Sequence, residues 1–481
     1  TAVSLIYLFL KNNFPELSVK YYIPDRYSEG YGISLAGIDF AKKNSCSLMI
    51  ALDCGIKAID EIKYAKEQDI DVIVCDHHTP DDILPDAVAI LDPKRKDCNY
   101  PYKELSGCGV GFKLLQALSI EKGIALDNLF SFIDLVALSI ASDIVPITDE
   151  NRILCRYGLK KIIENPLPGI RAIMKQLGIL GEKIEVSDLV FKIGPRINAS
   201  GRMTHAKESV KLLIGKISEN LIDKADTVNI LNTKRKEIDA IIRNEAFEMI
   251  KQSADYYTRK SIVLLKNDWY KGVLGIVASR VVEEFYKPTV LLTESEGMLV
   301  GSARSVDGFD LYEAIDACRD YLENYGGHKF AAGLSMKKES FKHFYKKFEE
   351  YVASKITDTQ LEKKLQFDLE ISLSEINWQL FRKLNLLRPF GPGNMTPVFV
   401  TSALRDTGKS KIVGKHNDHL QLFLTDGKQE IKAIAFGMAD KLNLVKHSQI
   451  KICYTIESNH YRGESSLQLF IKAIFDDTQN K

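Results

Sequence analysis

Three short apolar runs near the start of the chain each end in an aspartate, and together they limit the possible folds more than any other feature. The runs are "SLMIALD" (47–53), "DVIVCD" (71–76) and "AVAILD" (87–92). A segment with helical periodicity, residues 56–68, separates the first two. Apolar strands that alternate with helices are typical of βαβ units with a buried parallel sheet. Ligands bind beyond the carboxyl ends of such strands, where Asp53, Asp76 and Asp92 lie.

The rest of the chain changes character several times, so we predict four parts in its 481 residues. Between Lys216 and Lys271 there is no Pro or Gly, and the charged segment has apolar residues at spacings of three and four, which indicates a long helix. A second alternation of strands and helices follows, and the end of the chain reads as short alternating strands. We expect an α/β domain with a parallel sheet (1–215), a long connecting helix (216–257), a second α/β domain (258–363) and a small β-barrel of the OB type (364–481).

Composition excludes several classes of protein. The 65 basic and 64 acidic residues balance, so any site for an anion such as nucleic acid must be local. No apolar stretch reaches the roughly 20 residues that a membrane span needs. The eight cysteines never form a C-x-x-C pair, which favours reduced thiols and a cytoplasmic location over disulfides or a zinc site.

Carboxylates and imidazoles recur at the predicted switch points between strands and helices. Asp53 ends the first strand, Asp76, His77 and His78 end the second, and Asp143 follows a helical apolar run in "SIASDIVP". Successive side chains of a strand point to opposite faces, so both histidines can serve one site only if the chain turns there. Taken alone, such an aspartate commonly caps a helix and such a His-His pair commonly lies on the surface. The combination favours a site for Mn²⁺ or Mg²⁺.

Several glycine-rich stretches carry basic side chains. They are "GPRINASGR" (194–202), "GSARS" (301–305) and "YGGHKFAAG" (325–333). Glycine lets the backbone approach an anion closely, and the arginine fork suits phosphate oxygens. Ordinary surface loops are the alternative. A further stretch, "SGCGVG" (106–111), lacks the full dinucleotide fingerprint and a preceding strand, which favours the packed start of a helix.

The order of these motifs resembles the DHH phosphoesterase family. "ALDCG", "VCDHH", "ASDIVP" with "ENR" after it, and "GPRINASGR" are similar to its successive motifs. "GSARS" and "GGHKFAAG" resemble the DHH-associated nucleic-acid-binding module, and "RPFGPGNMTPVF" before a β-barrel resembles the RecJ single-strand exonucleases. The resemblance covers essentially the whole chain. It implies a 5′-to-3′ exonuclease that cleaves single-stranded DNA to 5′-mononucleotides in repair and recombination, with two Mn²⁺ or Mg²⁺ ions.

The resemblance also implies roles for residues. Asp53 would bridge the two ions, His77 and Asp143 would complete one site, His78 would face the scissile phosphate, and Asp76 would orient the histidines. The residues implied to contact the strand and its phosphates are Arg196, Asn198, Arg202, Ser302, Arg304, His328 and Lys329. Candidate stacking residues on the barrel are Phe423, Tyr454 and Tyr461, although a position in the core is the stronger interpretation of Phe423. Partners beyond single-stranded DNA would be a single-strand-binding protein and a helicase, with no membrane involved.

One departure from the family concerns the start of the chain. The family's first motif, Asp-x-Asp-Gly, occurs nowhere in the sequence, and we expect it upstream of Thr1. On this reading, residues 1–481 alone lack metal ligands and are expected to bind single-stranded DNA with little or no nuclease activity. Two other readings stay open: a DHH phosphodiesterase for nanoRNA or cyclic dinucleotides, and a DNA-binding protein with an inactive site.

Overall fold

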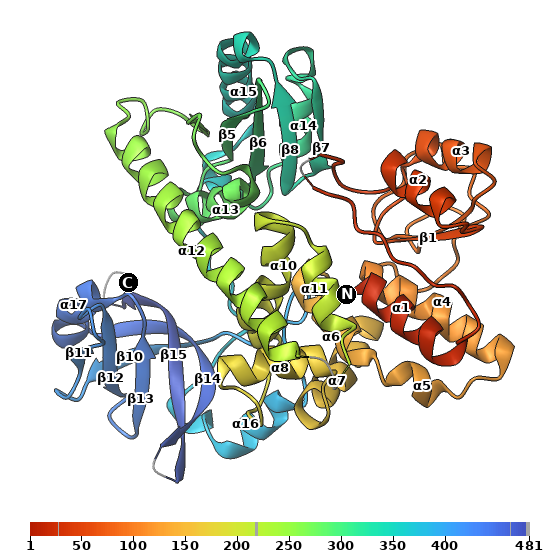
Figure 1. The fold of residues 1–481 in the computed structure, drawn as a ribbon. Coiled ribbons are helices and arrows are strands. Elements are labelled where there is room, and N and C mark those ends of the chain that lie inside the picture. The colour runs from red at the N-terminus through yellow and green to blue at the C-terminus, as the bar shows by residue number, and fades with distance from the viewer. Residues whose placement is uncertain (27, 217–219, 462, 478–481) are drawn as a thin grey trace. The chain divides into compact units, whose positions relative to one another are not determined.

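The structure, a computed structural model, divides into two compact units (Figure 1). It describes residues 1–26, 28–216, 220–461 and 463–477, with only the backbone described at Tyr461. The first unit contains Thr1–Ser142 and Gly158–Lys364, and the second contains Asp143–Tyr157 and Leu365–Lys481.

The first unit begins with the predicted parallel sheet. Its elements are α1 (Ala2–Asn13), α2 (Leu35–Lys43), β1 (Leu48–Leu52), α3 (Ile59–Glu67), β2 (Asp71–Cys75) and β3 (Ala89–Leu91). The strands are parallel, in the order β1-β2-β3. Ile38 of α2, Ile62 of α3 and the strand residues Val72 and Val74 form one buried cluster. The alternation of apolar strands and helices in the sequence therefore predicted this sheet correctly.

Helices make up the next part of the chain. They are α4 (Gly107–Lys122), α5 (Leu126–Phe130), α6 (Ile133–Asp143), α7 (Asp149–Glu164), α8 (Pro168–Leu177), α9 (Val186–Asp188), α10 (Gly194–Met203), α11 (Lys207–Leu213) and α12 (Leu221–Gln252). Helix α12, with 32 residues, is the predicted long helix, and it packs against α8, α10 and α13. The reading of "GPRINASGR" as a surface loop is wrong, because a π-helical turn (Leu189–Ile193) leads directly into α10.

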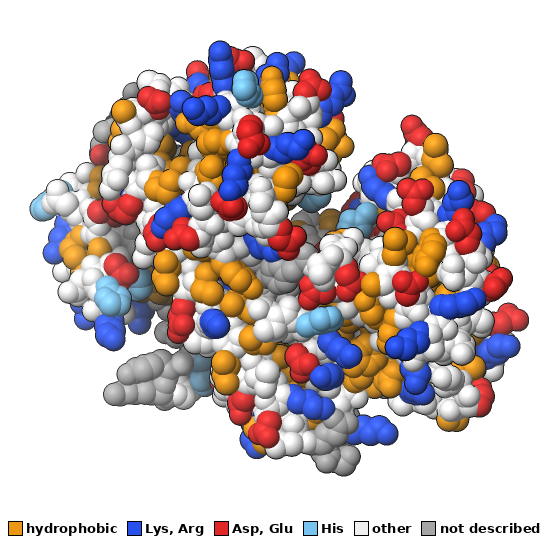
Figure 2. Space-filling model, turned by 45° about the horizontal axis from the view of Figure 1, so that its top comes forward, with side chains coloured by type: hydrophobic (Ala, Val, Ile, Leu, Met, Phe, Trp, Pro, Cys, Tyr) orange, Lys and Arg blue, Asp and Glu red, His pale blue; other side chains and the backbone are white. Residues whose placement is uncertain are grey.

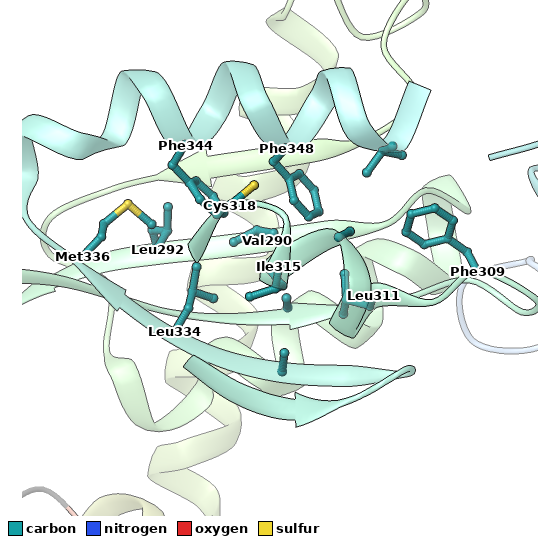
Figure 3. Close-up of a cluster of buried hydrophobic side chains, with 14 of the residues drawn as sticks. Val290, Leu292, Phe309, Leu311, Ile315, Cys318, Leu334, Met336, Phe344 and Phe348 are labelled. Atoms are coloured by element: carbon teal, nitrogen blue, oxygen red, sulfur yellow. The ribbon is translucent and has the colours of Figure 1, made fainter. Parts of the chain in front are cut away.

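A five-stranded sheet follows in the first unit. Its elements are β4 (Ile262–Leu265), α13 (Leu274–Phe285), β5 (Thr289–Ser295), β6 (Met298–Arg304), α14 (Leu311–Asp316), β7 (Asn324–His328), β8 (Ala331–Met336) and α15 (Phe341–Lys355). The strand order is β4-β5-β6-β8-β7, and only β4 and β5 are parallel. Figure 3 shows Phe344 and Phe348 pointing from α15 toward the sheet, where they share a core with Leu334 and Met336. Strand β8 ends at Met336, and α15 begins at Phe341.

The second unit contains the barrel. Its elements are β9 (Leu369–Glu370), α16 (Trp378–Asn385), β10 (Phe399–Asp406), β11 (Lys411–Val413), β12 (His419–Thr425), β13 (Glu430–Ala435), α17 (Leu442–His447), β14 (Ile450–Tyr461) and β15 (Glu464–Asp476). The order is β11-β12-β13-β15-β14-β10-β9, and β12 also pairs with β10. This extra pairing closes five strands into the predicted OB-type barrel.

The residues just after Asp143 belong to the second unit because they hold the linker that leads into the barrel. The Arg152 guanidinium donates to the carbonyls of Leu387 (3.1 Å) and Leu386 (2.8 Å), just beyond the end of α16. The amide of Ile147 donates to the carbonyl of Pro392 at 2.6 Å. A cation suits the unsatisfied carbonyls at a helix C-terminus. The "ENR" stretch therefore ties two segments of the chain together that are more than 200 residues apart.

The surface agrees with the balanced composition. On the face shown in Figure 2, acidic, basic and hydrophobic side chains are interspersed. Among the helices in the described part of the chain, none combines the length and the hydrophobicity that crossing a membrane requires.

Candidate metal centre

Asp53 follows β1, and hydrogen bonds of its backbone amide and carbonyl hold it in place. Its φ of 64° lies in the left-handed region, which aspartate tolerates better than most residues. Its amide donates to the carbonyl of Cys75 at 2.8 Å, and its carbonyl accepts from the hydroxyl of Tyr31 at 2.7 Å. The side chain is directed to His77, with 3.1 Å between Oδ1 and Nε2. The turn after β1 thus places a carboxylate beside an imidazole.

Asp76 is the buried centre of the DHH triplet. It is 1% exposed, and Oδ1 lies 2.6 Å from Nδ1 of His78 and accepts the amide of His77 at 2.7 Å. Oδ2 accepts the amide of Ile56 at 3.0 Å. Burial alone would raise the pKa of Asp76, but the bonds from His78 and the amide of Ile56 outweigh it and lower the pKa. Asp76 is therefore a carboxylate that fixes the orientation of the His78 ring.

The structure brings Asp53, His77 and His78 together. Each offers one ligand atom, and these atoms all lie within 4.8 Å of one another. Neighbouring Cys54 is not part of this group of ligand atoms, and burial, with the charges of Asp76 and Asp53, raises the pKa of its thiol to about 12. Carboxylate oxygen and imidazole nitrogen without thiolate fit Mn²⁺ or Mg²⁺ better than structural zinc.

Asp143, the remaining predicted ligand, is the last residue of α6. It belongs to the second unit, whereas the cluster of Asp53, His77 and His78 belongs to the first. Its membership of the metal site therefore stays a prediction.

Two features near the cluster had no role assigned from the sequence. Asp92, directly after β3, is buried and accepts the amide of Lys94 at 2.8 Å. Burial raises the pKa of Asp92 to about 6. The charge of Asp76 also raises this pKa, and the charge of His77 lowers it.

Gly107, at the start of α4, lies against the side chain of Asp53. The reading of "SGCGVG" as a helix start is confirmed, with the Ser106 hydroxyl accepting the amide of Gly109 at 3.1 Å. The glycines of "SGCGVG" were the feature of the sequence that could have indicated this close approach.

Ser302 and Arg304 lie together on β6. The Arg304 guanidinium donates to the Ser302 hydroxyl (2.9 Å) and to the carbonyl of Ala303 (2.7 Å), and burial lowers its pKa. Both side chains abut the first turn of α13, because a Cβ on Gly275 would lie 2.7 Å from the guanidinium and 3.0 Å from the hydroxyl. A half-buried cation, a hydroxyl and a helix N-terminus all favour an anion.

His328 and Lys329 lie at and just after the end of β7. The pKa of His328 is lowered by burial and then by the positive charges of Arg304, His78 and Lys94. The charges of Arg304 and His78 therefore both influence the pKa of His328. The Lys329 ammonium lies 4.9 Å from the ring centre of Phe330.

The three residues from "GPRINASGR" lie on α10. The Arg196 guanidinium donates to the Asn229 side chain (2.9 Å) and to the carbonyl of Lys192 (2.7 Å), and Arg202 donates to the carbonyl of Gly272 at 3.2 Å. Asn198 is exposed. These contacts give the two arginines a structural role, holding α10 to α12 and to the segment before α13.

Comparison with known proteins identifies the family. Residues 1–140 match the DHH family N-terminal domain, residues 258–354 match the DHHA1 domain, and residues 367–473 match the RecJ OB domain. The single-stranded-DNA-specific exonuclease RecJ of Haemophilus influenzae is 33% identical over 479 residues, which cover 95% of this chain and 82% of that protein. The chain belongs to the RecJ family.

Other members of the RecJ family agree. RecJ of Bacillus subtilis is 35% identical over 460 residues, and the match covers 94% of this chain but only 57% of that relative's length. A crystal structure of RecJ in complex with Mn²⁺ from Thermus thermophilus superimposes with a TM-score of 0.84 and 26% identity, covering 99% of this chain and 67% of that one. The fold and family implied by the sequence motifs are confirmed.

Proposed function

We propose that this protein is a metal-dependent exonuclease that hydrolyses the phosphodiester bonds of single-stranded DNA from the 5′ end and releases 5′-mononucleotides. The observation that carries the proposal is the cluster of Asp53, His77 and His78, placed by the turns after β1 and β2 in a chain of the RecJ family. Repair and recombination are the processes in which such an activity would serve.

The cluster has the donors that Mn²⁺ or Mg²⁺ would need. Asp53 and His77 would hold the ions, and Asp143 is the third ligand proposed from the sequence. Bound divalent ions would activate a water molecule and neutralise the charge that develops on the phosphate. The similar Thermus structures carry Mn²⁺ and Mg²⁺, respectively, which supports this choice of metal.

His78 is the proposed partner of the scissile phosphate. Because Nδ1 of His78 is engaged by Asp76 at 2.6 Å, Nε2 is the nitrogen that would donate to a phosphate oxygen. A ring that is already oriented loses little freedom when substrate binds. Asp76 therefore contributes by positioning His78.

The anion site on β6 would hold the terminal 5′-phosphate. The Arg304 guanidinium, the Ser302 hydroxyl and the first turn of α13 converge there. Phosphate contacts along the strand are proposed for His328 and Lys329, and contacts on the route to the metals for Arg196, Asn198 and Arg202. Among the three residues on α10, Asn198 is exposed, whereas Arg196 and Arg202 are half-buried.

The activity can be tested with labelled single strands, matched duplexes and dinucleotides, each incubated with the full-length protein in Mn²⁺, Mg²⁺ or EDTA. We expect 5′-mononucleotides from long single strands, little cleavage of duplexes, and loss of cleavage in EDTA. Cleavage confined to dinucleotides would favour the small-substrate phosphodiesterase. Tight DNA binding without cleavage under any metal would favour the inactive DNA-binding protein.

The exposed aromatic side chains of the barrel differ from those predicted to stack on bases. Tyr454 is wholly buried and bonded to Thr401 at 2.7 Å, so its predicted role in stacking is wrong; the side chain of Tyr461 lies outside the described residues. Phe436 is 48% exposed and lies between His419 (4.8 Å between ring centres) and Phe470 (4.9 Å).

Phe436 is therefore the aromatic side chain that we propose for base stacking, and the Lys472 ammonium, 5.6 Å from the ring centre of Phe470, adds positive charge. Since stacking contributes about 1–3 kcal/mol per base, Phe436→Ala should raise the Kd for single-stranded DNA about 5- to 150-fold in a fluorescence anisotropy titration. Phe475→Ala is the matched control, because Phe475 is also 48% exposed on the barrel. Equal effects of the two changes would contradict the assignment.

The predicted cytoplasmic location, the single-strand-binding protein and the helicase remain expectations from the sequence. A pull-down of the purified protein with each candidate partner, with and without single-stranded DNA, is the measurement that addresses the last two.

A further inference from the structure

The first residue of α4 has no room for a side chain, and the atoms that fill the space belong to Asp53. A Cβ on Gly107 would overlap Oδ1 of Asp53 and would lie 2.5 Å from Cγ and 2.6 Å from Cβ of the same residue. Carbon atoms that are not bonded to each other do not approach so closely. The overlap involves three atoms of Asp53, so a small rotation of the carboxylate alone would not relieve it.

Asp53 has little freedom to move away. Its backbone is in the left-handed conformation, its amide is bonded to the Cys75 carbonyl and its carbonyl to the Tyr31 hydroxyl. Oδ1 is already 3.1 Å from Nε2 of His77. Any displacement that an added methyl group caused at Asp53 would therefore change the spacing of the proposed metal ligands.

Helix α4 is also held in place. Its first turn is buried, and the helix packs against α1, β1 and β2. The N-terminus of a helix favours a nearby negative charge, which suits the position of the Asp53 carboxylate. The space between α4 and β1 thus fits this side chain when residue 107 is glycine.

The other glycines of the same helix do not share this constraint. A Cβ on Gly109 would lie 3.4 Å from the Ser106 hydroxyl, and one on Gly111 would lie 3.4 Å from a methyl group of Leu52, both ordinary contacts. Alanine is the better helix former, so glycine at position 107 has no explanation in helix stability.

We propose that Gly107 is a positioning residue for the metal centre: its missing side chain lets the Asp53 carboxylate lie against the start of α4, beside His77. The inference rests on the proposed role of Asp53 as a metal ligand. Gly107 itself would touch neither metal nor substrate.

The test compares Gly107→Ala, Gly109→Ala and Asp53→Asn in the full-length protein, with Mn²⁺ binding measured by calorimetry. We expect Gly107→Ala to weaken Mn²⁺ binding about 10- to 100-fold, as loss of a supporting residue does in other metal sites. Gly109→Ala should bind like the unaltered protein. Normal Mn²⁺ binding by Gly107→Ala, with weak binding by Asp53→Asn, would overturn the inference. Normal binding by Asp53→Asn would instead overturn the assignment of Asp53.

A second measurement covers the case in which Gly107→Ala folds poorly. Asp53→Gly removes the side chain that the new methyl group would meet, and glycine accepts the left-handed backbone of position 53. In EDTA, Gly107→Ala should lower the melting temperature in the unaltered background and should have little effect in the Asp53→Gly background. An equal loss in both backgrounds would show that α4 packing, not Asp53, requires the glycine, and would overturn the proposal.

Discussion

Replacing His78 with alanine is expected to lower kcat for cleavage of single-stranded DNA by about 10²- to 10⁴-fold, the range over which positioned proton donors and electrostatic groups contribute to catalysis. The His78 ring is held by the buried carboxylate of Asp76, so it is oriented before substrate binds. Its loss should remove an interaction that matters most in the transition state, while the phosphate contacts proposed for β6 remain.

The measurement is single-turnover cleavage of a labelled strand, combined with a Kd for the same strand in Ca²⁺ or without metal. We expect the Kd of His78→Ala to stay near that of the unaltered protein. His447→Ala is a control, because His447 is an exposed histidine at the end of α17. A parallel loss of binding and cleavage would mean that His78 holds the strand and has no separate part in the reaction.

Asp53→Asn is expected to weaken Mn²⁺ binding by at least about 100-fold and to reduce cleavage accordingly, since it alters a proposed ligand and not merely a supporting residue. Asparagine has nearly the same shape and also tolerates a φ of 64°, so the change removes charge while keeping the turn after β1. Titration with Mn²⁺ and cleavage at increasing Mn²⁺ concentration are the two measurements.

Asp69→Asn provides the matched control for this change. Asp69 also has a left-handed backbone, with a φ of 58°, but its side chain is 94% exposed and lies 3.5 Å from Lys42. Surface ion pairs of this kind contribute little, so Asp69→Asn should leave both measurements unchanged. Weak Mn²⁺ binding by both variants would point to a general effect of carboxylate loss and away from a ligand at position 53.

The sequence predicted the parts of the molecule that depend on local pattern. The apolar runs that form β1 and β2 are each followed by an aspartate. These aspartates lie at the same end of the sheet, because parallel strands have their carboxyl ends there. For the same reason, the proximity of Asp53 and the DHH triplet could be predicted from their spacing. The charged segment without Gly or Pro gave α12 correctly.

Errors arose where packing overrides composition. The Gly, Pro, Asn and Ser of "GPRINASGR" favour a loop, yet α10 forms because it packs between α11 and α12. Tyr454 has the alternating neighbours of a half-exposed strand, but the barrel closes around it. The short strand β11 could not be predicted individually, since its three residues have no pattern of their own. Contact between Gly107 and Asp53 joins residues 54 positions apart, which no local pattern reveals.

Closure of the barrel does not pair every strand along its whole length. The bond between β12 and β10 closes the ring, but among the described residues 455–461 of β14 and 464–468 of β15 pair only with each other. Long open edges are templates on which other chains add strands, and very short ones are a common protection against aggregation. The outer parts of β14 and β15 are therefore the place in this sheet where another extended chain could add a strand.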